Sequence, residues 1–187
     1  MGTEDAAGFA TALLGARQGS AAGLSDVFRE LQPAVLGYLR AREPRAADDL
    51  AGETWLAVAQ RINTFEGDRQ AFVAWLFTIA SHRLIDFRRT SSRRGTNAVG
   101  QTLNTSLEPT AEQLALSNLS AQATIDLIVR FLSSDQAEVI LLRVLGDLSL
   151  AQIALVMNRD VDWVGVTLHR GLKRLTIRLQ TRVLLMR

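Results

Sequence analysis

The stretch WVGVTLHRGLKRL, residues 163–175, combines residue types that could bind a nucleic acid. Its end is basic, and arginine and lysine side chains hold phosphate oxygens. Its middle, Gly165-Val166-Thr167, carries no charge, but valine and threonine methyl groups can touch a thymine methyl in the major groove. If the stretch is helical, one face carries all the candidate DNA contacts: Trp163, Val166, Thr167, Arg170, Lys173 and Arg174.

The charge of the chain is unevenly distributed, although the net charge over 187 residues is only +2. Residues 81–100 hold five arginines against one aspartate, and residues 159–187 hold seven basic residues against two aspartates. The rest of the chain is net acidic. Two separate basic patches are typical of a protein that binds a polyanion. The alternative for each patch is an ordinary solvated surface.

Composition argues against several other classes of protein. Cysteine is absent, which excludes disulfides and cysteine-bound zinc and fits a reducing cytoplasm. The two histidines, His82 and His169, lie far apart and the carboxylates form no cluster, so we expect no metal site and no cofactor. No catalytic residues are expected either, because we find neither a nucleophile–base set nor a glycine-rich phosphate loop. The sequence contains no run of about 18 apolar residues, so we expect no membrane span.

The elements that must position these residues are helices, because proline is scarce and no alternating strand pattern persists. Residues 47–65 show this most clearly: Asp49 and Glu53 lie one turn apart, outside an apolar stripe with alternating spacings of four and three. That stripe consists of Ala51, Trp55, Val58, Ile62 and Phe65. The sequence therefore predicts an all-α fold.

The stretch TSSRRGTNAVGQTLNTSLEPT, residues 90–110, interrupts the helical pattern with small and polar residues and predicts a flexible linker. We place a lead-in at 1–22, a first helical domain at 23–90, the linker at 91–110 and a second helical domain at 111–187.

The second domain contains the pattern of a helix-turn-helix. Ser149 and Gln152 have the spacing of a capping box, and Asn158 ends the helix that they open. A tight turn then leads to a longer helix with a basic flank. Its buried face is predicted to consist of Val161, Val164, Leu168, Leu172, Leu175 and Leu179. The alternative is a plain helical hairpin without DNA contacts.

Two blocks of the chain together resemble the extracytoplasmic-function (ECF) group of bacterial sigma factors. The block DDLAGETWLAVAQRINTFEGDRQAFVAWLFTIASHRLIDFRR is similar to the family's region 2, and LSSDQAEVILLRVLGDLSLAQIALVMNRDVDWVGVTLHRGLKRL is similar to region 4. The resemblance covers about residues 25–180. It implies a subunit that binds RNA polymerase core and directs it to promoters.

The resemblance also implies roles for particular residues. Region 2 would dock on the clamp helices of the β′ subunit through Asp49, Glu53 and Trp55, and the β flap would be a second contact of the polymerase. The −10 promoter element would be opened and read by His82, Arg83, Asp86, Arg88 and Arg89. The −35 element would be read by the face of 163–174, where Gly165-Val166-Thr167 departs from the charged residues common in the family. An anti-sigma factor commonly holds such proteins.

Two other functions remain open on the sequence. The runner-up is a helix-turn-helix regulator that binds DNA without polymerase core, although we find no long dimer helix. A sigma-like module that only binds other proteins is the second, given the departure at 165–167. An enzyme ranks behind both.

Overall fold

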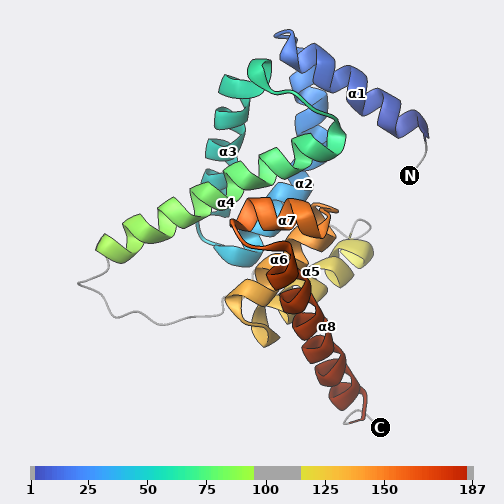
Figure 1. Cartoon of the computed structure of the whole chain (residues 1–187), viewed down its shortest axis with the longest axis vertical. Helices are drawn as coiled ribbons and strands as arrows, with labels where there is room; N and C mark the ends of the chain where they lie inside the picture. Colours follow the sequence, from blue (N-terminus) through green and yellow to red (C-terminus); the bar gives the residue numbers. More distant parts are fainter. Residues whose placement is uncertain (1–2, 95–114, 185–187) are drawn as a thin grey trace.

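The computed structural model describes residues 3–94 and 115–184, and every regular element in these ranges is helical. The first domain contains α1 (Thr3–Arg17), α2 (Ala21–Arg42), α3 (Ala47–Arg61), a short 3-10 turn η1 (Ile62–Thr64) and α4 (Arg69–Arg94). The second contains α5 (Ala115–Phe131), α6 (Ser134–Leu145), α7 (Leu150–Met157) and α8 (Val161–Leu184). The all-α prediction in two helical domains is confirmed (Figure 1).

The first domain begins earlier than predicted, because the supposed lead-in contains a packed helix. Phe9, Leu13 and Ala16 of α1 are buried. The ring centroids of Phe9 and of Phe72 in α4 lie 6.1 Å apart. A Cβ atom on Gly23 of α2 would lie 2.6 Å from backbone atoms of α1, so only glycine permits this close helix crossing. The segment predicted as a lead-in at 1–22 thus contains a helix, which local patterns did not reveal because its contact depends on small residues rather than on a long apolar stripe.

The core of the first domain follows the predicted apolar stripe. All five of its residues, from Ala51 to Phe65, are buried. Aromatic rings extend this core across α4, where Phe72 packs edge-on against Phe65 with centroids 5.3 Å apart. The helix α4 continues to Arg94, four residues into the predicted linker. The rest of that linker, from residue 95 onward, lies outside the described residues.

The second domain has the predicted helix-turn-helix. Ser149 and Gln152 form a capping box at the start of α7, and Asn158 ends the helix in a left-handed conformation with φ of 51°. Residues 158–160 connect α7 to α8. Ser133 and Gln136 form a second capping box at the start of α6. These caps supply hydrogen bonds to backbone N–H groups that a helix start otherwise leaves without partners.

The buried face of α8 agrees in part with the predicted one. Val164 is fully buried and Thr167 and Gly171 are buried beside it, whereas Val161 and Leu172 are 46% and 49% exposed. Val164 of the predicted face is thus confirmed, and Leu168 and Leu175 are partly buried against the core. Val161 and Leu172 were wrong, because the prediction followed the aliphatic residues. The side chain of Leu179 lies outside the described residues. Gly171 explains the choice of face, because a Cβ there would lie only 2.9 Å from the Ile140 Cδ1 atom of α6.

The two domains pack against each other along α2 and α4 on one side and α5, α6 and α7 on the other. In Figure 1, α7 lies beside α4 and α8 extends away from the first domain. Across the contact, the Gln152 side chain donates to the Gln70 carbonyl oxygen over 3.1 Å, and Tyr38 donates to Glu138. Within the described ranges, no helix is both long enough and apolar enough to cross a membrane.

Candidate interface for polymerase and promoter DNA

An exposed acidic edge lies on α3. Asp49 and Glu53 are exposed, and neither has an ion-pair partner among the described residues. Their neighbour Asp48 differs, because its carboxylate accepts a hydrogen bond from Arg40 over 3.2 Å. Asp49 also lies in the first turn of the helix, where the helix dipole stabilises a negative charge. The two free carboxylates can therefore meet a basic partner without first breaking an internal bond.

Trp55, predicted as a polymerase contact, lies inside the first domain instead. Its ring is 8% exposed and its Nε1–H donates to the Gln32 Oε1 atom over 2.6 Å. Phe28 packs edge-on against it with centroids 5.0 Å apart. The cause is its place in the apolar stripe, which turns the side chain toward α2. Trp55 therefore helps to hold α3 on α2, and a polymerase contact by this residue stays a prediction.

The predicted −10 residues lie on the second half of α4. His82, Asp86 and Arg89 are exposed and Arg83 is partly exposed. His82 and Asp86 are one turn apart, so their side chains share a face of the helix. Leu84 is buried between these positions and Ser81 directly before them, and both hold α4 against the domain. This end of the helix can present hydrogen-bonding groups and cations on a rigid support.

Arg88 differs from its neighbours because it already has partners in the protein. Its Nη2 atom donates to the Arg42 carbonyl oxygen over 2.5 Å, and its Nε atom lies 3.6 Å from the Glu43 Oε2 atom. The guanidinium thus satisfies a carbonyl at the end of α2, where cations are favoured. A phosphate contact by Arg88 would have to replace these bonds.

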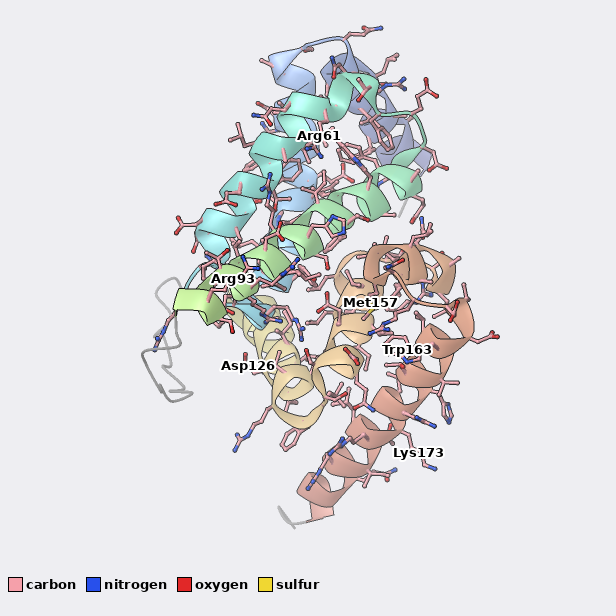
Figure 2. All side chains as sticks on the ribbon, turned by 60° about the vertical axis from the view of Figure 1, so that its left-hand side comes forward. Arg61, Arg93, Asp126, Met157, Trp163 and Lys173 are labelled. Carbon is pink, nitrogen blue, oxygen red and sulfur yellow. The ribbon has the colours of Figure 1, made fainter. Side chains whose placement is uncertain are left out.

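On α8 the predicted DNA contacts divide into two groups. Val166, Arg170, Lys173 and Arg174 are exposed, and Trp163 is partly buried. The Arg159 guanidinium lies 5.1 Å from the centre of the Trp163 ring, a cation–π distance. Figure 2 shows Trp163 and Lys173 along this helix. Thr167 is only 9% exposed, so in this conformation it packs against the domain and does not offer a groove contact.

Sequence reasoning missed a buried polar cluster between the domains. Arg42 of α2 and Glu138 of α6 form an ion pair in which each side chain is 9% exposed, with Arg42 Nε 2.8 Å from Glu138 Oε2. Burial, followed by the charge of Glu138, raises the pKa of the Tyr38 phenol well above its ordinary value, so Tyr38 stays a hydrogen-bond donor. The signal in the sequence was a glutamate inside the apolar run AEVILL.

A metal centre finds no support in the described residues, where no three histidine, aspartate or glutamate side chains come together as a metal site would need. The arrangement that remains is an exposed acidic edge on α3, a polar and basic end of α4 and a basic face of α8. All three surfaces suit macromolecular partners of opposite or mixed charge better than a small molecule.

Two family matches cover these surfaces. Residues 27–94 match sigma-70 region 2, and residues 123–175 match sigma-70 region 4. The first match contains α3 with its acidic edge and the whole of α4. The second contains the helix-turn-helix and ends at Leu175, within α8. The order of the two regions along the chain is the predicted one.

Curated relatives agree with these matches. The ECF RNA polymerase sigma factor SigD of Mycobacterium tuberculosis is 30% identical over 159 residues, which cover 81% of this chain and 74% of SigD. BldN of Streptomyces coelicolor, also an ECF RNA polymerase sigma factor, is 34% identical over 139 residues, covering 74% of this chain. The chain spans about half of the length of BldN, 52%.

Solved structures share the fold at lower sequence identity. RpoE of Bartonella quintana, solved in complex with the anti-sigma factor NepR, aligns with a TM-score of 0.68 at 21% identity, over 83% of this chain and 96% of that one. CnrH, solved in complex with the cytosolic domain of CnrY, aligns with a TM-score of 0.64 at 19% identity, over 93% and 98%. With both sigma-70 regions in order and these relatives, the chain belongs to the ECF sigma factors.

Proposed function

We propose that this protein is a dissociable initiation factor that binds RNA polymerase core and directs it to promoters through their −10 and −35 elements. The observation that carries the proposal is the exposed acidic edge of α3 within a region 2 match that also contains the basic end of α4. One small domain thus offers a protein-binding surface and a DNA-binding surface side by side. The helix-turn-helix of the second domain adds a second DNA-binding element.

Polymerase docking is assigned to Asp49 and Glu53. These two carboxylates are exposed and unpaired within the described residues, so a basic surface on the clamp helices of β′ would gain charge pairs without displacing an internal partner. A contact between region 4 and the β flap belongs to the same proposal. Trp55 and Gln32 support docking indirectly, because their hydrogen bond fixes α3 on α2.

Promoter opening is assigned to α4. Opening a duplex costs stacking and pairing energy, and capture of an extruded base can offset that cost. His82 and Asp86 can hydrogen-bond a base edge, while Arg83 and Arg89 can hold the flanking phosphates. Because Leu84 and Ser81 anchor the same turn of helix in the core, these groups need little reorganisation before they bind.

Contact with the −35 element is assigned to the exposed residues of α8. Arg170, Lys173 and Arg174 supply phosphate contacts, and Val166, 48% exposed, can touch a thymine methyl. The uncharged stretch at 165–167 removes the arginine-to-guanine contacts that give about 1–3 kcal/mol of discrimination. We infer that region 4 holds DNA chiefly through its phosphates.

Two further statements belong to this proposal. The protein would act in the cytoplasm, where polymerase is found, and would contribute no catalytic step of its own. An anti-sigma factor is proposed as its regulator, in keeping with the complex in which RpoE of Bartonella quintana was solved.

Run-off transcription tests the function directly. Purified core polymerase is mixed with this protein and with genomic fragments, and transcripts are mapped to their start sites. We expect transcripts that depend on both proteins and that begin a fixed distance downstream of shared −10 and −35 sequences. Binding of DNA fragments without any effect on core polymerase would instead support a helix-turn-helix regulator.

A further inference from the structure

The outer half of α8, residues 172–184, lies beyond the packed part of the second domain. Val164, Thr167 and Gly171 are buried in the first half of this helix, but among the described side chains after Gly171 none is buried. At 1.5 Å per residue, the outer half is about 20 Å long. Figure 1 shows it projecting past α5 and α6. The match to sigma-70 region 4 ends at Leu175, so most of this segment lies outside that match.

The charge of the outer half has a single sign. Its residues include four cations, Lys173, Arg174, Arg178 and Arg182, and no carboxylate. The nearest carboxylate before them on the helix belongs to Asp162, about three turns away. Lys173, Arg174 and Arg178 are exposed, and none of these three forms an ion pair in the described part of the chain. A positive surface without internal partners attracts an anionic one.

Apolar residues accompany these cations. Leu172 is 49% exposed, and Leu175, Leu179 and Val183 follow it at spacings of three and four, which predicts one apolar stripe along the helix. Leu175 is partly buried against the second domain. The stripe therefore begins on the domain and is predicted to continue along the outer half. The four cations occupy other positions of the helical repeat, so the segment is amphipathic.

The end of α5 adds an aromatic side chain to the same surface. The Arg178 guanidinium lies 5.8 Å from the centre of the Phe131 ring, and the Arg130 guanidinium lies 5.7 Å from it, both cation–π distances. Phe131 is partly exposed, and its neighbour Val129 is 42% exposed. Phenylalanine is common on the apolar face of helices that lie on a membrane surface. The end of α5 and the outer half of α8 thus form one surface of cations and apolar groups.

Charge and composition decide between the possible occupants of this surface. A second copy of the chain would bring two sets of four cations together without a carboxylate to pair with them, so self-association of the outer half is disfavoured. A nucleic acid would pair with the cations but would leave the apolar stripe in water. The end of α4 shows the difference, because residues 88–94, RRTSSRR, are cationic and contain no apolar residue. Only a partner with anionic groups above an apolar layer matches both features of the outer half.

We propose that the outer half of α8 binds the surface of a membrane that contains anionic phospholipids. The helix lies in the plane of the interface, its apolar stripe enters the acyl-chain boundary, and its cations contact the lipid phosphates. This inference goes beyond the proposed function and does not depend on it. Lys173 and Arg174 are also proposed DNA contacts, so a protein held at a membrane through α8 does not offer these two cations to a promoter.

Co-sedimentation with vesicles tests the attraction. The full chain is mixed with vesicles of phosphatidylglycerol and phosphatidylcholine in equal parts, and with vesicles of phosphatidylcholine alone. We expect the partition coefficient to be at least about ten-fold higher on the anionic vesicles and to fall as salt screens the charges. Arg178→Gln should lower it about five-fold, the contribution of one cation near such a surface. Arg61→Gln removes an exposed cation from α3 and should change it by less than about two-fold. Equal partition on the two kinds of vesicle would overturn the proposal.

A second pair of variants tests insertion of the apolar stripe. Leu172→Ser should lower binding to the anionic vesicles about ten-fold, because it removes an aliphatic side chain that the membrane would bury. Leu155→Ser on α7, where the leucine is 76% exposed, is the matched control and should bind like the unchanged protein. Equal binding by the two serine variants would overturn the proposal. Weak binding by Arg178→Gln with full binding by Leu172→Ser would show attraction by charge alone, as to a nucleic acid, and would overturn it as well.

A fluorescent label reports the orientation of the helix and does not depend on how well Leu172→Ser folds. The chain has no cysteine, so Leu172→Cys and Ile177→Cys each give a unique site for a nitrobenzoxadiazole label, at positions that are 49% and 53% exposed. The two positions lie about 140° apart around the helix. With the anionic vesicles, emission from position 172 should shift to the blue and rise at least about two-fold as the label leaves water, whereas emission from position 177 should change less. Equal changes at both positions, or no change at either, would overturn the proposed insertion.

Discussion

The helices α4 and α8 both carry exposed cations, but they hold them differently. On α4 the polar residues alternate with buried Ser81 and Leu84, so the whole segment is fixed on the first domain. On α8, buried residues up to Gly171 give way to a mostly exposed stretch from Leu172 onward. A fixed surface suits capture of an extruded base, which demands defined geometry. A helix that extends from its domain suits phosphate contacts, which tolerate small displacements.

The largest effect should come from the acidic edge, which lies on α3 and so on neither of these two helices. Asp49→Lys combined with Glu53→Lys should lower the affinity for polymerase core by about a hundred-fold, because like charges at an interface cost several kcal/mol. The fold should persist, since exposed side chains contribute little to stability. Titration of labelled core measures the affinity. Glu66→Lys, an exposed charge reversal in the loop between η1 and α4, should have little effect. An unchanged affinity in the double variant would refute the docking assignment.

The next largest effect should come from substitutions on α4, which should affect promoter opening more than duplex binding. Alanine at His82, Arg83 or Asp86 should slow open-complex formation by about ten-fold, since loss of a charge-assisted hydrogen bond costs roughly 1.5–3 kcal/mol, while binding of closed duplex should change less. Permanganate reactivity of unpaired thymines reports opening. Arg61→Ala removes the same charge as Arg83→Ala from an exposed site near the end of α3 and serves as the control. Normal opening in all three variants would take the −10 role from α4.

The sequence predicted elements well where apolar periodicity is long. The stripe through Ala51 and Trp55, the capping boxes and the helix-turn-helix all follow from local rules that residue spacing records. The same periodicity predicts that Trp55 is buried, and its assignment as a polymerase contact came from the resemblance alone. Local signals thus predicted the helix and the burial of Trp55, whereas they contain no information on a contact between Trp55 and polymerase.

Contacts between helices were harder to predict, because they depend on the absence of side chains. Gly23 and Gly171 each permit a close crossing, and neither contributes to an apolar pattern. The packing of α1 and the burial of Gly171 on α8 were missed for this reason. The buried polar cluster between the domains was missed because Tyr38 and Glu138 lie 100 positions apart in sequence, and nothing in their local patterns connects them.

A smaller effect should distinguish two glycines of α8. Gly171→Ala should destabilise the second domain by up to about 1 kcal/mol, because its Cβ would press on the end of the Ile140 side chain. That overlap costs about 1–3 kcal/mol, and about 1 kcal/mol of gained helix propensity offsets part of it. Gly165→Ala should stabilise the helix by up to about 1 kcal/mol, since a Cβ there meets only a Leu150 methyl at 3.9 Å. Thermal unfolding followed by circular dichroism compares them. Equal melting temperatures would contradict the proposed close approach of α6 and α8.

The smallest effect concerns how α8 holds DNA. Gly165 has room for a long side chain, so Gly165→Lys should raise the affinity for duplex a few-fold and steepen the log–log salt dependence by about one unit if the amine reaches a phosphate. Arg170→Ala should lower the affinity on all sequences alike. Fluorescence anisotropy of the full chain on several duplexes, at several salt concentrations, measures both.

The competing hypothesis is that Trp163, Val166 and Thr167 form a specific apolar contact to thymine. Because Thr167 is buried, we expect Thr167→Ala to leave discrimination among thymine-containing sites unchanged. If Thr167→Ala instead abolishes this discrimination, and the affinity depends little on salt, the apolar contact would be favoured over phosphate binding.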